Sequence, residues 1–84
     1  MPLGSAPRGF RGRIVGLRPE GVDTSLTAAE LERRLLELGF VEGEEVEIAH
    51  EGTFGRDPIA VHVGGTTIGL RRREAMAILV RQVA

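Results

Sequence analysis

The sequence contains no cysteine, tryptophan, tyrosine or lysine, and phenylalanine occurs only three times among its 84 residues. Because cysteine is absent, neither disulfides nor a thiolate metal site can hold the chain together, and packing must supply its stability. So few aromatic rings leave no evident platform for stacking bases or gripping proline-rich peptides. No run reaches the roughly 18 to 20 apolar residues of a membrane span, and the N-terminus lacks the apolar segment of a signal peptide. We therefore expect a cytoplasmic protein without direct membrane insertion.

The net charge and the length of the chain further narrow the class of protein that it can be. Eleven arginines face twelve acidic residues, so the formal net charge is −1, whereas a dedicated nucleic-acid binder is usually basic. Hydrophobic residues make up 42% of the chain, which lies in the ordinary range for a folded globular domain. A chain of this length forms one domain at most, so we expect a single domain over residues 1–84 with a thin core.

One helix is marked at both ends. Thr27 at the N-cap and Glu30 three residues later form a capping box, and Leu26 with Leu31 forms a hydrophobic staple. Gly39 ends the helix, because a left-handed residue after the last turn is cheap only without a Cβ. Between these signals one apolar stripe recurs at helical spacing, formed by Leu31, Leu35 and Leu38.

The remaining chain is typical of short strands. Gly64-Gly65 predicts a two-residue hairpin turn, which places Val61 opposite Ile68 and Ile59 opposite Leu70 on one aliphatic face. Because an open sheet would expose its edges, the strands should curl into a closed or nearly closed barrel. Apolar alternation and β-branched runs predict five strands, over residues 12–17, 45–50, 58–63, 66–70 and from 78 onward, with one helical turn at 72–77.

Three segments of the chain resemble the FeoA family, ferrous iron transport protein A, and the FeoA-type domain of DtxR-type iron-dependent repressors. They occur in the family's order: Gly12-Arg13-Ile14-Val15, Leu38-Gly39-Phe40-x-x-Gly43, and Leu70-Arg71-Arg72. The resemblance implies a mainly β fold, an SH3-like five-stranded barrel with one α-helix after the first strand and a short helical turn before the last. It also implies a cytoplasmic accessory of FeoB, the membrane permease for ferrous iron.

Two side chains form the candidate metal site. If the second and third strands pair about the loop between them, Glu47 falls opposite His62 on the outer face. Carboxylate and imidazole groups bind divalent transition metals, but a charged pair on a solvated face is the structural alternative. His50 shares the inner face of its strand unless a bulge intervenes, so we do not expect the two histidines to meet.

Two surfaces are candidates for contact with a partner. Phe54 lies between two glycines at the tip of a loop, followed by Arg56, and Leu36 lies off the apolar stripe of the helix. An exposed aromatic side chain at a loop tip can anchor a partner, but the same ring can fold down and cap the barrel. The sequence leaves these two interpretations of Phe54 open.

The arginine triplet Arg71, Arg72 and Arg73 also has two interpretations. Guanidinium groups match phosphate oxygens, which would suit nucleic-acid contact. In the structural alternative, Arg71 and Arg72 flank a seam of the barrel and pair with glutamates, while Arg73 is solvated. The lack of aromatic stacking partners favours the structural alternative.

The pattern does not support an enzyme. Ser5 and Ser25 have no histidine nearby in the sequence, and the glycines never form a phosphate-binding loop before a helix. We expect an adaptor that binds the cytoplasmic part of FeoB, modulates ferrous iron uptake and requires no cofactor. The alternatives are a metal-responsive module that binds a divalent transition metal weakly through Glu47 and His62, and a small RNA-binding barrel. The sequence leaves open whether the protein forms a weak homo-oligomer.

Overall fold

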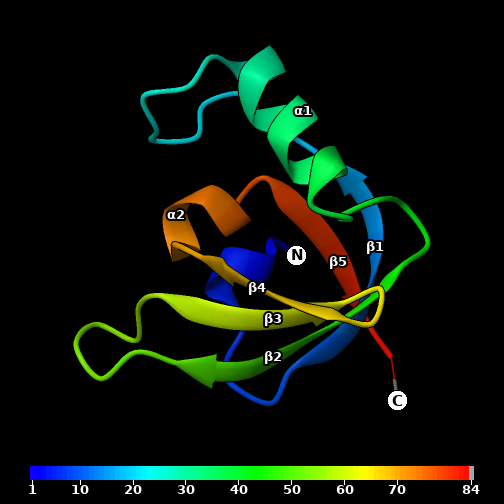
Figure 1. Ribbon diagram of the computed structural model, residues 1–84, viewed down its shortest axis with the longest axis vertical. Coiled ribbons are helices and arrows are strands. Elements are labelled where there is room, and N and C mark those ends of the chain that lie inside the picture. Colours follow the sequence, from blue (N-terminus) through cyan, green and yellow to red (C-terminus); the bar gives the residue numbers. More distant parts are fainter. Residues whose placement is uncertain (84) are drawn as a thin grey trace.

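The computed structural model describes residues 1–83, which form one five-stranded antiparallel sheet in the order β4-β3-β2-β1-β5 (Figure 1). The predicted fold class is confirmed: the chain is mainly β, with one α-helix after the first strand and a short helix before the last. Along the chain the elements are η1 (Leu3–Ser5), β1 (Arg11–Leu17), α1 (Ala28–Glu37), β2 (Glu45–Glu51), β3 (Ile59–Val63), β4 (Thr66–Leu70), α2 (Arg72–Ala75) and β5 (Ile78–Gln82).

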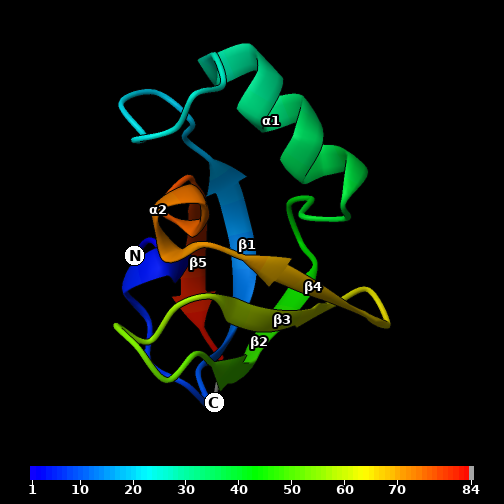
Figure 2. The ribbon, with the colours of Figure 1, turned by 60° about the vertical axis from the view of Figure 1, so that its left-hand side comes forward.

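The sheet is strongly curved but does not close completely (Figure 2). Among the described residues, β4 and β5 form no backbone pairing with each other, so the barrel is open along this seam. The short helix α2 connects the two strands, and η1 packs against both α2 and β5. The sequence predicted no element before residue 12, yet Leu3 of η1 is completely buried. The N-terminal turn therefore belongs to the core of the fold.

The hairpin register follows the sequence prediction. Gly64 and Gly65 have φ angles of 55° and 80°, and Val61 pairs with Ile68. Ile59 likewise pairs with Leu70, and the inward side chains of β3 are almost completely buried. Because side chains alternate along a strand, this register directs the aliphatic face of the hairpin into the barrel.

Helix α1 has the predicted ends. The backbone N–H of Glu30 donates to the Thr27 hydroxyl, and the backbone N–H of Thr27 donates to the Glu30 carboxylate. At the other end, Gly39 has a φ of 105° and the Phe40 N–H donates to the Leu35 carbonyl. This Schellman arrangement brings the fully buried Phe40 ring under the helix. Both ribbon views place α1 at one end of the barrel, beside the end of β1 (Figures 1 and 2).

A β-bulge in β2 decides the position of His50. The register of β2 against β3 shifts between Ile48 and His50, so one extra residue lies on the β2 side. Such a shift reverses the alternation of side chains. Ile48, before the shift, is fully buried. His50, after the shift, is therefore exposed and does not share the inner face of Ile48.

Candidate functional site

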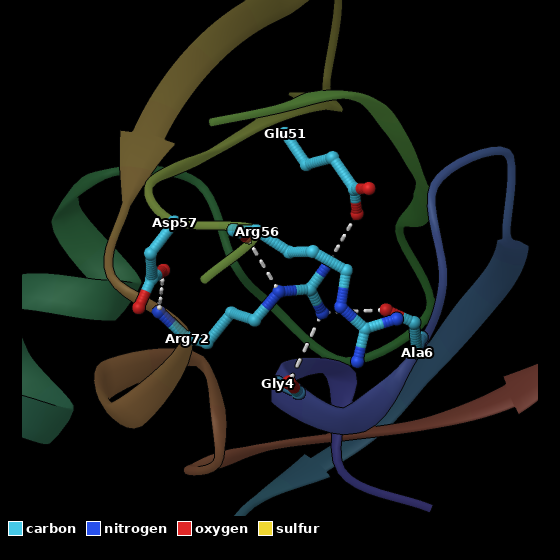
Figure 3. Close-up of polar contacts among 6 residues, drawn as sticks. All are labelled: Gly4, Ala6, Glu51, Arg56, Asp57 and Arg72. Atoms are coloured by element: carbon cyan, nitrogen blue, oxygen red, sulfur yellow. Dashed lines mark hydrogen bonds and ion pairs between the residues drawn. The ribbon is translucent and has the colours of Figure 1, made fainter. Parts of the chain in front are cut away.

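Among residues 1–83, Arg72, the first residue of α2, forms more side-chain hydrogen bonds than any other residue (Figure 3). Its Nε donates to the Arg56 carbonyl at 2.8 Å, and its Nη2 donates to Glu51 Oε1 at 2.9 Å. Its Nη1 donates to two carbonyls of the N-terminal segment, that of Gly4 at 3.1 Å and that of Ala6 at 2.6 Å. One guanidinium group thereby joins three segments that are distant in the sequence.

The surroundings of Arg72 decide between the two interpretations of the arginine triplet. Its side chain is only 13% exposed and forms an ion pair with Glu51, so it has little freedom to contact phosphate. Arg73 is exposed, as the structural alternative predicts. The predicted ion pair of Arg71 is wrong: among residues 1–83 its guanidinium joins no carboxylate, and its backbone N–H donates to Glu74 instead. The triplet is thus one half-buried arginine between two solvated ones.

The loop between β2 and β3 is held closed at its base and turns sharply at its tip. At the base, the Gly52 N–H donates to the Pro58 carbonyl at 2.8 Å, and a Cβ at Gly52 would collide with the Asp57 carbonyl. At the tip, the Asp57 N–H meets the Phe54 carbonyl at 3.4 Å. Gly55 and Arg56 between them both have positive φ angles, 66° and 58°, as in a type I′ turn. Because a Cβ would collide at the base, position 52 of this loop requires glycine.

Phe54 projects from the tip of this loop into solvent. Its side chain is 90% exposed, so the interpretation that it caps the barrel is wrong. Leu36 on α1 is 42% exposed and borders a hollow of about 210 Å³ together with Gly16, Leu17, Glu32 and Glu42. Figures 1 and 2 both show the β2–β3 loop and α1 at different ends of the molecule. The structure thus separates Leu36 from Phe54 and Arg56, so these residues form two surfaces.

The two predicted metal ligands lie where the sequence placed them. Glu47 pairs directly with His62 across β2 and β3, and the His62 Nδ1 lies 2.7 Å from the Thr67 hydroxyl. Both side chains border a hollow of about 400 Å³, whose other acidic residues are Glu44 and Glu45. In the described part of the chain, however, no group of three or more His, Cys, Asp or Glu side chains could hold a metal ion. The register is confirmed, and metal binding stays a prediction.

The polar network also contains residues that no sequence pattern selected. The Asp57 carboxylate accepts the backbone N–H of Arg72 at 2.8 Å, and so gives a partner to one free N–H in the first turn of α2. Gly4 and Ala6 contribute only their carbonyl groups. No local signal marks these partners, because fifteen or more residues separate each of them from Arg72.

The fold and its surface define a class: a small SH3-like barrel that carries an exposed aromatic loop. No helix within residues 1–83 is long and apolar enough to cross a membrane. A family model described as the FeoA domain matches residues 1–82, and this chain therefore belongs to the FeoA family.

Solved structures agree with this assignment. FeoA of Stenotrophomonas maltophilia, crystallised with zinc and described as a prokaryotic SH3 domain protein, is 33% identical; the match covers 96% of this chain and 89% of that one, with a TM-score of 0.76. Iron(II) transport protein A of Clostridium thermocellum is 37% identical over 99% of this chain and 46% of that one, with a TM-score of 0.80. IdeR of T. acidophilum, 20% identical over 99% of this chain and 34% of that one, shares the fold with a TM-score of 0.69. No curated protein matches the sequence.

Proposed function

We propose that this chain is a cytoplasmic, non-catalytic accessory protein of ferrous iron uptake, which binds the cytoplasmic part of a FeoB-type permease and modulates its transport. The observation that carries the proposal is the match of the FeoA domain over residues 1–82. The relative from S. maltophilia, 33% identical, is itself described as a candidate activating factor of ferrous iron transport. An accessory of this kind acts through surface complementarity and needs no cofactor of its own.

The contact residues in this proposal are Phe54, Arg56 and Leu36. Exposed aromatic and arginine side chains are the residue types that most often dominate binding energy at interfaces. Leu36 adds an apolar contact at the edge of its hollow on α1. Because the loop and the helix are separate surfaces, a permease that engages both must contact two parts of the barrel.

Binding to the full-length permease in lipid nanodiscs tests the proposal. Wild type is compared by biolayer interferometry with Phe54→Ala, Arg56→Asn and Leu36→Ala, where asparagine tolerates the positive φ of Arg56 without its charge. We expect Phe54→Ala to weaken binding roughly tenfold or more, as at an interface hot spot. Thr53→Ala in the same loop is the matched control. If wild type does not bind the permease, the proposed function is wrong; unchanged binding in all three variants removes these surfaces.

A second candidate function, a metal-responsive module, is favoured by the direct pairing of Glu47 with His62 on the outer face. The relative from S. maltophilia was crystallised with zinc, which supports this candidate. Isothermal titration of the tag-free protein with Zn²⁺, Mn²⁺ and, without oxygen, Fe²⁺ tests this function. Micromolar binding that is lost in both Glu47→Gln and His62→Asn supports it. His50→Asn is the control, because His50 is exposed but pairs with Ala60 rather than with a carboxylate.

A further inference from the structure

The β2–β3 loop is fastened on both of its arms by a single residue. Glu51, at the end of β2, accepts a hydrogen bond from the Arg72 Nη2, and the Arg56 carbonyl accepts one from the Arg72 Nε. The Arg72 backbone N–H donates to the carboxylate of Asp57 on the returning arm. The loop tip is thus connected to α2 and, through Ala6, to the N-terminal segment. These contacts restrict the loop (Figure 3), while its tip, residues 53–56, stays exposed.

Phe54 is the residue that this arrangement leaves outside. Its side chain is 90% exposed, whereas the other exposed large hydrophobic side chains of the described residues lie between 38% and 52%. Because the Phe54 ring stays in water, it adds no burial energy to the fold. Its loop also contains one non-glycine residue, Arg56, in the left-handed region. The fold therefore maintains an uncommon loop conformation around an aromatic ring that contributes nothing to its own core.

We propose that Arg72 is a positioning residue that presents Phe54 as a preorganised aromatic anchor for an apolar pocket on the cytoplasmic part of the permease. This inference rests on the proposed function. A loop that is already ordered loses less conformational entropy on binding than a free loop, so more of the ring's burial appears as affinity. The phenyl ring is inserted into the partner, and Arg72 itself stays inside the barrel.

Lysine at position 72 separates the geometry of this residue from its charge. A lysine ammonium can still reach the Glu51 carboxylate, but it cannot donate in three fixed directions as the guanidinium fork does. We therefore expect Arg72→Lys to release the loop while keeping most of the fold. Gly52→Ala releases the loop independently, because its Cβ collides with the Asp57 carbonyl and forces the loop base apart.

The experiment is a double-mutant cycle measured against the full-length permease in nanodiscs. Wild type, Arg72→Lys, Phe54→Ala and the double variant are compared, with Arg73→Lys as the solvated control and Gly52→Ala as the second loop variant. We expect Arg72→Lys and Gly52→Ala each to weaken binding roughly three- to tenfold, and Arg73→Lys to leave it unchanged. Adding Arg72→Lys to Phe54→Ala should weaken binding much less than Arg72→Lys does alone, because only the contact of Arg56 is then left to lose. Heteronuclear NOE values of the Phe54 amide should fall in Arg72→Lys without any partner present.

The outcomes distinguish this inference from the proposed function. If wild type fails to bind the permease, both are overturned. If wild type binds but Phe54→Ala binds equally well, the inference and the proposed Phe54 contact are overturned, while the proposed accessory function stands. If Arg72→Lys reduces the affinity by the same factor in wild type and in Phe54→Ala, Arg72 acts through the fold in general, and the inference is overturned. Unchanged NOE values for Phe54 in Arg72→Lys overturn it without reference to any partner.

Discussion

The Arg72 guanidinium donates to the Ala6 carbonyl over 2.6 Å, although 66 residues separate the two in the chain. This contact connects α2 with the segment that follows η1, beside the seam at which β4 and β5 do not pair. Because the chain has no cysteine, no disulfide can hold the two edges of this open barrel together, and side-chain contacts must do so. Arg72 therefore stabilises the fold and also positions the β2–β3 loop.

Arg72→Met should destabilise the protein strongly. The change leaves the Glu51 carboxylate and the carbonyls of Gly4 and Ala6 without their donor. We expect a loss of about 2 to 3 kcal/mol, less than for a fully buried ion pair because Glu51 keeps contact with water. Urea unfolding followed by circular dichroism measures it. Arg73→Met should change the free energy of unfolding by less than about 0.5 kcal/mol, and an equal loss there would contradict the prediction.

Two glycine substitutions should have opposite signs. Gly39→Ala forces alanine to a φ of 105° after α1, and we expect it to cost about 1 kcal/mol or more. Gly69 in β4 has no positive φ, and a Cβ there would meet no atom within 4 Å. Gly69→Ala should therefore stabilise the protein by about 0.4 to 1 kcal/mol, because alanine restricts the unfolded chain more than glycine does. Thermal unfolding of both variants tests this pair, and shifts of the same sign would refute the argument.

Thr27→Ala should weaken the start of α1. The Thr27 hydroxyl accepts the backbone N–H of Glu30 at 3.1 Å, and alanine cannot replace this cap. The expected cost is about 1 kcal/mol, which is typical of a lost N-cap. Thr27→Ser keeps the acceptor and should cost much less. Equal unfolding midpoints for the alanine and serine variants would show that the cap contributes nothing.

The carboxylate of Glu30 makes the stability of α1 depend on pH. The Thr27 backbone N–H lowers the pKa of Glu30 below its ordinary value, with further lowering by the Thr27 hydroxyl and by Arg33. Because the folded-state pKa is the lower one, the stabilisation is present at neutral pH and is lost as the pH falls through the lowered pKa. The difference in urea midpoint between wild type and Glu30→Gln should therefore shrink with acidification from pH 7 to pH 3. A constant difference across that range would exclude this linkage.

The sequence determined those features that depend on neighbours along the chain. The capping box of α1, the Schellman end at Gly39 and the turn at Gly64-Gly65 are each complete within a few residues, so residue type and spacing suffice to predict them. The hairpin turn also defined the register of β3 with β4. The position of Glu47 opposite His62 followed from alternation and the loop between their strands.

Only the tertiary structure decided the orientation of Phe54, the role of Arg72 and the exposure of His50. Whether a loop aromatic ring enters a core depends on the space that is left, and Phe10 and Phe40 already lie in this core. The partners of Arg72 are far away in the sequence, and the bulge before His50 arises from how two strands fit together. Such contacts depend on how distant segments approach one another in three dimensions, which no local pattern of residues encodes.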